Sequence, residues 1–308
     1  MADDLYDLAI IGGGPAGYTA GIYAGRSGLK SVILEKAMTG GQMALSYLIE
    51  NWPGEEEIAG QDISMKMRSH AEKYCEIREF SEVQSIEKED IFTIETSDGT
   101  VKAKAVILAT GAEHRKLGIP GEDTYNGKGV SYCATCDGFF FKGKKVFVVG
   151  GGNTALEYAI YLQNVGCRVS LIHRRDEFRA EKSLQDKLKD IEVNLIMDSV
   201  VEEISGDDIM KSITVRNVRT GEVRTVEGDG IFVAIGEIPN NELAAYIGLD
   251  LDDEGYVRTD RRMATSVPGV YAAGDLAGGL KQIIIAAAGG AQAATSVFED
   301  LMHPYWIE

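Results

Sequence analysis

Short apolar runs that lead into glycine-rich segments recur along the chain, and they predict the buried strands of a parallel sheet. "LAIIGGGPAG" (8–17) and "VFVVGGGNTA" (146–155) match closely, and small and apolar residues at helical spacing follow each of them. A second apolar run follows each predicted helix, at residues 31–34 and 169–172. The pattern therefore predicts two strand–helix–strand units and an α/β fold.

Both units carry a Gly-x-Gly-x-x-Gly/Ala fingerprint between the predicted strand and the predicted helix. Its residues are Gly12, Gly14 and Gly17 in the first unit and Gly150, Gly152 and Ala155 in the second. Gly28 and Gly166 follow at the same spacing and are expected to end the two helices. Glycines let the backbone approach a pyrophosphate, and the helix N-terminus donates N–H groups to it. The sequence therefore predicts two dinucleotide-binding sites.

The two predicted sites differ at the end of the second strand. Glu35 can accept hydrogen bonds from an unphosphorylated ribose, so the first site predicts either FAD or NAD. In the second unit His173 is followed by Arg174 and Arg175, with Arg179 shortly after. Guanidinium groups suit a 2′-phosphate, so the second site predicts NADPH.

Each unit continues into a strand-rich segment with a tight turn. The turns are expected at "SDGT" (97–100) and "RTGEV" (219–223). Each segment ends in an apolar strand and a glycine, "VILATG" (106–111) and "IFVAIG" (231–236). These strands are expected to bring the chain back to the nucleotide-binding sheet.

A third apolar strand, "GVYAAGD" (269–275), precedes a predicted helix of small residues at 281–294. The second unit is complete by residue 236, so this segment is expected to return to the first unit. Asp275, at the end of a strand and close to a helix N-terminus, suits the ribityl chain of a flavin.

The segment "GVSYCATCDGFF" (129–140) holds the residues with the most distinctive chemistry. Cys133 and Cys136 could form half of a zinc site, a structural disulfide or a redox dithiol. No second Cys-x-x-Cys pair is present and the four histidines are scattered, which disfavours zinc. A chain with only four cysteines is not a disulfide scaffold, so a redox dithiol is the leading interpretation.

Composition narrows the class of protein. A length of 308 residues suggests two domains, and 44% hydrophobic with 26% charged residues is typical of a globular protein. The net charge of −17 argues against nucleic acid or an anionic membrane surface as a partner. The acidic N-terminus does not resemble a targeting segment, so we expect a cytoplasmic protein.

Taken together, these motifs resemble those of the low-molecular-weight thioredoxin reductases of bacteria and archaea. The matching segments are "GGGPAG", "GGQ", "ENWPG", "CATCDG", "GGGNTA", "HRR...R", "FVAIG" and "GVYAAGD", which run from residue 7 to about residue 294. The resemblance implies two Rossmann-like three-layer domains, with the NADPH domain (116–247) inserted into a discontinuous FAD domain (1–115 and 248–308). It also implies a homodimer and thioredoxin, or a thioredoxin-like protein, as the partner.

The resemblance also implies which residues form the sites. Cys136 would lie against the flavin, Cys133 would attack the partner disulfide, and Asp137 would handle the proton of the dithiol. FAD is expected to contact Gly12, Gly14, Pro15, Ala16, Gly17, Glu35, Lys36, Gly40, Gly41, Gln42, Asn51, Val83, Thr110, Gly111, Gly274, Asp275, Lys281, Gln282 and Ile283. NADPH is expected to contact Gly150, Gly152, Asn153, Thr154, Ala155, His173, Arg174, Arg175, Arg179, Ile235 and Gly236. Lys281 departs from the arginine that the family usually has there, and no metal is expected.

The predicted activity is thioredoxin-disulfide reduction, with electrons passing from NADPH to FAD and then to the Cys133–Cys136 disulfide. One alternative keeps the fold but uses another electron donor, such as NADH or ferredoxin. A second alternative is a flavin redox sensor without turnover. Because the nicotinamide and the disulfide must both reach one flavin, we also expect two orientations of the inserted domain.

Overall fold

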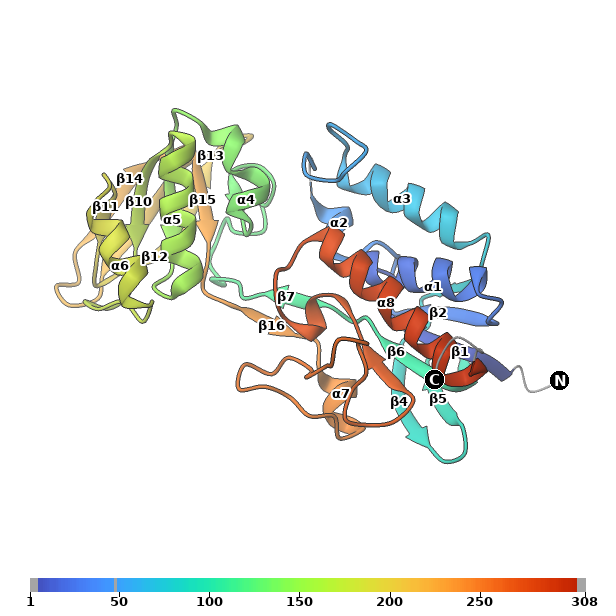
Figure 1. The fold of residues 1–308 in the computed structure, drawn as a ribbon. Coiled ribbons are helices and arrows are strands. Elements are labelled where there is room, and N and C mark those ends of the chain that lie inside the picture. The colour runs from blue at the N-terminus through green and yellow to red at the C-terminus, as the bar shows by residue number, and fades with distance from the viewer. Residues whose placement is uncertain (1–4, 47–48, 304–308) are drawn as a thin grey trace. The chain divides into compact units, whose positions relative to one another are not determined.

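The computed structural model describes residues 5–46 and 49–303 of the chain, which divide into two compact units (Figure 1). The first unit contains the chain up to Glu113 together with the chain from Ile238 onward. The second unit is the continuous segment His114–Glu237. Parallel sheets with helices in both units confirm the predicted α/β class.

The first unit is built on a seven-stranded sheet in the order β3-β2-β1-β6-β5-β4, with β17 paired to β6. Its elements are β1 (Leu5–Ile11), α1 (Pro15–Arg26), β2 (Ser31–Glu35), α2 (Gly41–Leu45), α3 (Gly60–Ala71), β3 (Glu76–Glu79), β4 (Val83–Lys88), β5 (Phe92–Thr96), β6 (Gly99–Leu108), α7 (Glu242–Tyr246), β17 (Val270–Ala272), η2 (Gly274–Ala277) and α8 (Ile283–Met302). β1, β2, β3, β6 and β17 run parallel, whereas β4 and β5 form an antiparallel hairpin.

In addition to its pairing with β1, strand β6 pairs with a different strand in each of its two halves, an arrangement called the fork of β6 below. Its first half, from Gly99 to Ala103, pairs antiparallel with β5. Its second half, from Val106 to Leu108, pairs parallel with β17. Residues near the C-terminus therefore complete the sheet that the N-terminal half of the chain begins.

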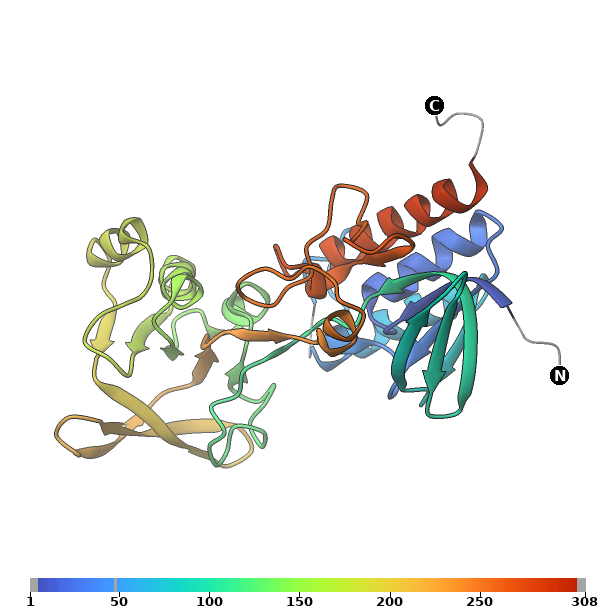
Figure 2. The same cartoon turned by 90° about the horizontal axis from the view of Figure 1, so that it is seen from below.

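The central strands β1, β2 and β17 are buried on both faces, which accounts for their largely continuous apolar sequences. Leu8 and Ile10 of β1 face the core under α1, α3 and α8, and Ala9 and Ile11 face the core under the β4–β5 hairpin and α7. Figures 1 and 2 both show α1 and α8 side by side on one face. Small residues permit this approach, since a Cβ atom on Gly290 would lie 2.1 Å from the carbonyl oxygen of Ala16.

The second unit has a five-stranded parallel sheet in the order β11-β10-β9-β15-β8 and a three-stranded antiparallel sheet, β12-β13-β14. Its elements are β8 (Val130–Ser131), α4 (Ala134–Asp137), η1 (Gly138–Phe141), β9 (Lys145–Val149), α5 (Asn153–Val165), β10 (Arg168–Ile172), α6 (Lys182–Lys189), β11 (Asn194–Ile196), β12 (Ser199–Gly206), β13 (Met210–Asn217), β14 (Val223–Glu227) and β15 (Gly230–Val233).

This unit has three layers. Val146 and Val148 of β9 pack toward α5 and α6, and Phe147 and Val149 pack toward the antiparallel sheet. Figure 2 shows the helices α5 and α6 on one side of the parallel sheet and the strands β12–β14 on the other. Because successive side chains of a strand point to opposite faces, the parallel sheet contributes to two separate hydrophobic cores.

The two crossings between the units are the short strands β7 (Ala112–His114) and β16 (Glu237–Pro239), which pair with each other. Each strand directly follows a glycine with positive φ, at Gly111 (71°) and Gly236 (105°). A residue with a side chain rarely adopts this conformation, so glycine is the favoured residue at both exits.

The predicted elements agree with the structure apart from their ends. The turns predicted at 97–100 and 219–223 join β5 to β6 and β13 to β14. The apolar strands predicted within 106–111 and 231–236 are present and end at Leu108 and Val233, ahead of the glycines. The helix predicted at 281–294 begins at Ile283 and continues to Met302, because buried Ser296 and Val297 extend its apolar face.

Candidate active site

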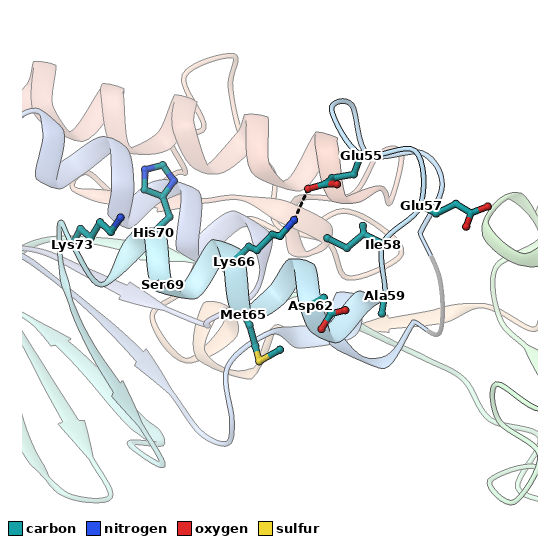
Figure 3. Close-up of a pocket in the computed structure, with 10 residues that line it drawn as sticks. All are labelled: Glu55, Glu57, Ile58, Ala59, Asp62, Met65, Lys66, Ser69, His70 and Lys73. Atoms are coloured by element: carbon teal, nitrogen blue, oxygen red, sulfur yellow. Dashed lines mark hydrogen bonds and ion pairs between the residues drawn. The ribbon is translucent and has the colours of Figure 1, made fainter.

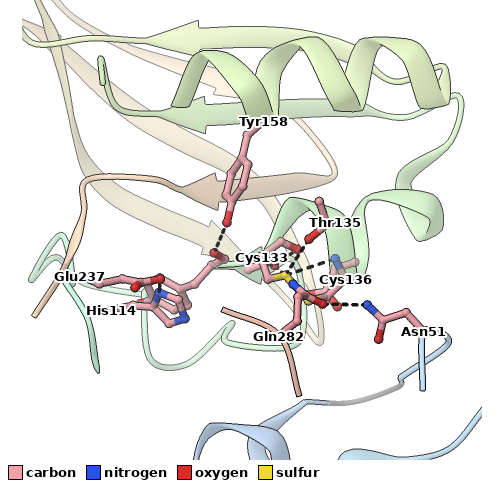
Figure 4. Close-up of a disulfide and its surroundings, with 11 residues drawn as sticks. Asn51, His114, Cys133, Thr135, Cys136, Tyr158, Glu237 and Gln282 are labelled. Atoms are coloured by element: carbon pink, nitrogen blue, oxygen red, sulfur yellow. Dashed lines mark hydrogen bonds and ion pairs between the residues drawn. A yellow bond between two sulfur atoms is a disulfide. The ribbon is translucent and has the colours of Figure 1, made fainter. Parts of the chain in front are cut away.

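Cys133 and Cys136 form a disulfide at the start of the short helix α4 (Figure 4). The backbone N–H of Cys136 donates to the Sγ atom of Cys133 at 3.2 Å. The hydroxyl group of Thr135 lies 3.4 Å from the same sulfur atom and can donate to it, since a disulfide sulfur has no hydrogen. Hydrogen bonds of this kind stabilise a thiolate, so Cys133 is prepared to carry negative charge after reduction.

Asp137 ends α4, directly after the disulfide, and is half-buried. The hydroxyl group of Ser131 donates to its Oδ2 atom at 2.6 Å. Burial raises the pKa of Asp137, and the Ser131 hydrogen bond acts in the opposite direction. A carboxyl group whose pKa is raised takes up a proton more readily and is suited to exchange one with a neighbouring thiol.

Tyr132 connects the cysteine segment to the segment that follows β7. Its hydroxyl group donates to buried Glu122 at 2.8 Å, and its ring stacks on that of His114 at 5.1 Å. Its carbonyl oxygen accepts from the Tyr158 hydroxyl group at 3.1 Å, and His114 pairs with Glu237 at 3.4 Å (Figure 4). The side chains of Glu122, His114 and Tyr158 thus contact Tyr132 and hold the backbone that leads into Cys133.

The first glycine-rich loop is a tight turn between β1 and α1. A Cβ atom on Gly12 would lie 2.2 Å from the carbonyl oxygen of Ala109, and one on Gly17 would lie 1.9 Å from that of Gly12. A Cβ atom on Gly14, in contrast, would meet nothing within 4 Å. The loop is therefore closed against the protein and open in front of α1, where a pyrophosphate would lie.

Several predicted flavin residues gather around this loop. Glu35 accepts from the backbone N–H of Gly13 at 2.8 Å, and the N–H of Gly40 donates to the carbonyl oxygen of Gly13 at 2.7 Å. A Cβ atom on Gly274 would lie 3.0 Å from the Cβ atom of Ala16. Three separate segments thus meet at the carboxyl end of β1, where ligands bind in open parallel sheets.

Other predicted flavin residues pair across long sequence distances within the first unit. The side-chain amide of Asn51 donates to Gln282 Oε1 at 3.0 Å (Figure 4), and the Thr110 hydroxyl group donates to the carbonyl oxygen of Asn240 at 2.7 Å. The ammonium group of Lys281 lies over the ring of Tyr256 at 4.6 Å. The remaining positions are Pro15 in α1, Lys36 after β2, Gly41 and Gln42 in α2, Val83 in β4, Gly111 after β6, Asp275 in η2 and Ile283 in α8.

The second glycine-rich loop repeats this geometry between β9 and α5. A Cβ atom on Gly150 would lie 2.2 Å from the carbonyl oxygen of Ala234 and 2.7 Å from the Cβ atom of Ala155. A Cβ atom on Gly152 would meet nothing within 4 Å. The remaining predicted residues of this site are Asn153 and Thr154 at the start of α5, and Ile235 and Gly236 after β15.

His173 lies between this loop and the predicted arginines. Its ring is buried, occupies the space where a Cβ atom of Gly151 would project, and lies with Nε2 3.1 Å from the carbonyl oxygen of Glu177. Burial lowers the pKa of His173, and the nearby arginines lower it further. The backbone N–H of Arg179 donates to the carbonyl oxygen of Gly151 at 2.8 Å. The ring therefore holds residues 174–179, which carry the three arginines and are called the arginine segment below, against the glycine-rich loop.

The side chains of Arg174, Arg175 and Arg179 are exposed. Two acidic residues, Asp176 and Glu177, lie between Arg175 and Arg179. Asp176 forms an ion pair with Arg219, which also pairs with Asp198 at 2.9 Å. The Arg219 pair directs Asp176 away from the three arginines, which together carry more positive charge than the two acidic residues carry negative charge.

Cys75 and Cys167 are not part of the redox pair. Burial raises the pKa of Cys75 to about 12 and also raises the pKa of Cys167. A thiol with a raised pKa is a weak nucleophile, so both residues are suited to packing. Within residues 5–46 and 49–303, no cluster of His, Cys, Asp or Glu side chains is placed to hold a metal ion.

A hollow of about 800 Å³ runs along α3 in the first unit (Figure 3). It is lined by Glu55, Glu57, Ile58, Ala59, Asp62, Met65, Lys66, Ser69, His70 and Lys73. Lys66 forms an ion pair with Glu55 at 2.5 Å across it. None of the predicted site residues lines this hollow, and its charges of both signs do not favour one class of ligand.

The sequence did not identify three residues that hold the redox segment, namely Ser131, Thr135 and Glu122. Ser131 and Thr135 lie close to the cysteines in the sequence, but hydroxyl residues are common and only the local turn brings them to a sulfur or a carboxylate. Glu122 is buried, and no periodic pattern distinguishes it from exposed acidic residues.

Comparison with known proteins agrees with this arrangement. The sequence pattern of the family described as pyridine nucleotide-disulphide oxidoreductase matches residues 6–290. A thioredoxin reductase of Listeria monocytogenes is 42% identical over 94% of this chain and 91% of its own, and one of Bacillus subtilis is 40% identical over 96% and 94%. The crystal structure of thioredoxin reductase from Streptococcus pyogenes has a TM-score of 0.92 at 43% identity, covering 98% of this chain and all of the other. The chain therefore belongs to the pyridine nucleotide-disulphide oxidoreductase family, among the thioredoxin reductases.

Proposed function

We propose that this protein is an NADPH-dependent flavoenzyme that reduces the disulfide of thioredoxin or of a thioredoxin-like protein. The observation that carries the proposal is the Cys133–Cys136 disulfide with the half-buried Asp137 directly after it. Family membership implies an oxidoreductase that uses a flavin and a nicotinamide nucleotide.

The two glycine-rich loops are suited to the two nucleotides. Both leave open space in front of a helix N-terminus, at Gly14 and at Gly152. The first loop has the carboxylate of Glu35 beside it, which suits the plain ribose of FAD. The second has Arg174, Arg175 and Arg179, which suit the 2′-phosphate of NADPH. We assign FAD to the first unit and NADPH to the second.

When bound, FAD would accept the hydride of NADPH and pass two electrons to the disulfide. Reduction breaks the Cys133–Cys136 bond and leaves a thiol and a thiolate once one proton has been taken up. The donors around Cys133 Sγ favour the negative charge on Cys133, which can attack the partner disulfide. Cys136 then attacks Cys133 Sγ, which breaks the bond to the partner, re-forms the Cys133–Cys136 disulfide and releases the partner as a dithiol. Asp137 supplies or accepts the proton that these steps exchange.

The arginine segment favours NADPH over the alternative donors. Ferredoxin would need no nucleotide loop in the second unit, and NADH would gain nothing from three exposed arginines. A redox sensor would need only one stoichiometric reduction and no repeated supply of electrons from NADPH, so it would not need the arginine segment either.

We further propose a cytoplasmic homodimer, consistent with the reducing compartment that a redox dithiol requires. No helix within the described residues has both the length and the apolar character to cross a bilayer.

Anaerobic titration of the FAD-loaded protein with NADPH tests the proposed function. The wild-type protein should consume about two equivalents of NADPH per flavin, because both the flavin and the disulfide take up two electrons. Cys136→Ser should consume one equivalent and should not reduce thioredoxin, whereas the control Cys75→Ser should behave as wild type. Thioredoxin turnover by Cys136→Ser, or a failure of the wild-type protein to turn over, would overturn the proposal.

A further inference from the structure

The hydroxyl group of Ser131 occupies a position that no part of the proposed chemistry has yet used. Ser131 is 5% exposed and ends β8, two residues before Cys133. Its Oγ atom accepts from the backbone N–H of Cys133 at 3.1 Å and donates to Asp137 Oδ2 at 2.6 Å. One buried hydroxyl group therefore contacts both the first redox cysteine and the carboxyl group that follows the second.

The hydroxyl hydrogen has two acceptors to choose between. Besides Asp137, the carbonyl oxygen of Cys133 lies 3.3 Å from Ser131 Oγ. When Asp137 is ionised, the shorter bond to its carboxylate is favoured. When Asp137 is protonated, its own O–H can donate to Ser131 Oγ while the Ser131 hydrogen turns to the Cys133 carbonyl oxygen. Both protonation states are thus satisfied without movement of heavy atoms.

We propose that Ser131 is a positioning residue that holds the Asp137 carboxyl group beside the dithiol in both protonation states and sets the pH range of its proton exchange. This inference rests on the role given to Asp137 in the proposed function. It does not depend on the identity of the electron donor or of the protein partner.

Other titratable groups near α4 do not take this role. The elements packed against it, together with its own helix and adjoining segments, carry Tyr132, Cys133, Cys136, Lys142, Glu157, Tyr158, Tyr161 and Cys167. Burial raises the pKa of Asp137, and the Ser131 hydrogen bond lowers it. Removing the Ser131 hydroxyl group should therefore raise the pKa of Asp137 further, because the effect of burial is then no longer opposed by this hydrogen bond.

The test is an infrared titration of the Asp137 carboxyl band in the full-length oxidised protein, with Asp137→Asn to identify the band. In Ser131→Ala and Ser131→Gly, both of which lack the hydroxyl group, the midpoint should move to higher pH by about one unit or more. Ser131→Thr retains the hydroxyl group and should keep the wild-type midpoint. Ser199→Ala, which removes another buried hydroxyl group of the same unit, should do the same.

The outcomes are separable from those of the proposed function, because this titration needs neither nucleotide nor protein partner. A midpoint that stays unchanged in whichever hydroxyl-free variant folds would overturn the role of Ser131, even if thioredoxin is reduced. A purely structural role would lower stability and activity at every pH without moving the midpoint. In the active enzyme, the pH profile of disulfide reduction should move in the same direction as the infrared midpoint.

Discussion

The two sulfur atoms of the redox pair share a bond but differ in their hydrogen-bonding partners. In the described structure the Cys133 sulfur has two donors, the N–H of Cys136 and the hydroxyl group of Thr135. This asymmetry supports a division of labour in which Cys133 carries the negative charge and attacks the partner. It also makes Thr135 a residue whose contribution can be measured.

Replacing Thr135 with Val removes one donor to the Cys133 sulfur and keeps the shape of the side chain. The alkylation rate of the reduced protein by iodoacetamide at pH 7 should fall about three- to tenfold, the effect of one lost hydrogen bond. Thr135→Ser retains the hydroxyl group and should react at nearly the wild-type rate. Equal rates for the Val and Ser variants would mean that the hydroxyl group does not stabilise the thiolate.

Much of the candidate site could be predicted at the residue scale, for a physical reason. Glycines in a strand-to-helix turn and a Cys-x-x-Cys pair are local patterns whose chemistry depends on close spacing. Ser131 and Glu122 could not be predicted, because their roles depend on a turn that brings a hydroxyl group to Asp137 and on burial that the sequence does not mark.

Among the elements, the segment after β10 shows how a loop can be ordered without regular secondary structure. The buried ring of His173 packs against Gly151 and lies 3.1 Å from the carbonyl oxygen of Glu177. Arg219 holds Asp176 from the neighbouring β13–β14 turn. The exposed arginines therefore extend from a backbone that these contacts hold in place, and an ordered backbone lowers the entropy cost of binding an anion.

Replacing Arg174 and Arg175 with Gln should raise the KM for NADPH far more than the KM for NADH. Each lost charge-assisted bond to a phosphate costs about 1.5–3 kcal/mol, which corresponds to roughly tenfold or more in affinity. Steady-state kinetics with both nucleotides measures the difference, with Arg168→Gln as an exposed arginine control in the same unit. A similar increase for both nucleotides would mean that these arginines do not recognise the 2′-phosphate.

The elements themselves were predictable where one face or both faces are continuously apolar, as in β1, β9 and α8. The ends of the elements were less predictable from the sequence. β6 and β15 end at Leu108 and Val233, before the glycines that the sequence suggested, because the chain leaves the sheet toward the crossings. The fork of β6 had no local signal, since it depends on a partner strand near residue 270.

At the scale of the whole molecule, the chain passes between its two units only through β7 and β16. Both crossings begin at a glycine of positive φ, Gly111 and Gly236. Backbone rotation at a few residues is enough to reorient a domain. These crossings support the expectation of two orientations, one for exchange between dithiol and flavin and one for exchange between nicotinamide and flavin.

Single-molecule energy transfer can test this expectation. Dyes attached at Glu89→Cys in the first unit and Glu222→Cys in the second would report on their separation, because both positions are exposed. The native cysteines should not react, since Cys133 and Cys136 are joined and the other two have raised pKa values. We expect two populations whose ratio changes when NADPH is added. A single narrow population under all conditions would contradict the two-orientation prediction.

The fork of β6 and the packing of α1 against α8 also have a consequence for biosynthesis. The ribosome releases the whole of His114–Glu237 before it makes β17 and α8, so the second unit can fold while the first is still incomplete. Translation proceeds at about 5–20 residues per second, so roughly ten to fifty seconds pass between the synthesis of α1 and the synthesis of α8, which covers its small-residue face. During that interval the nascent chain exposes an apolar surface, and the last-made helix is the one that covers it.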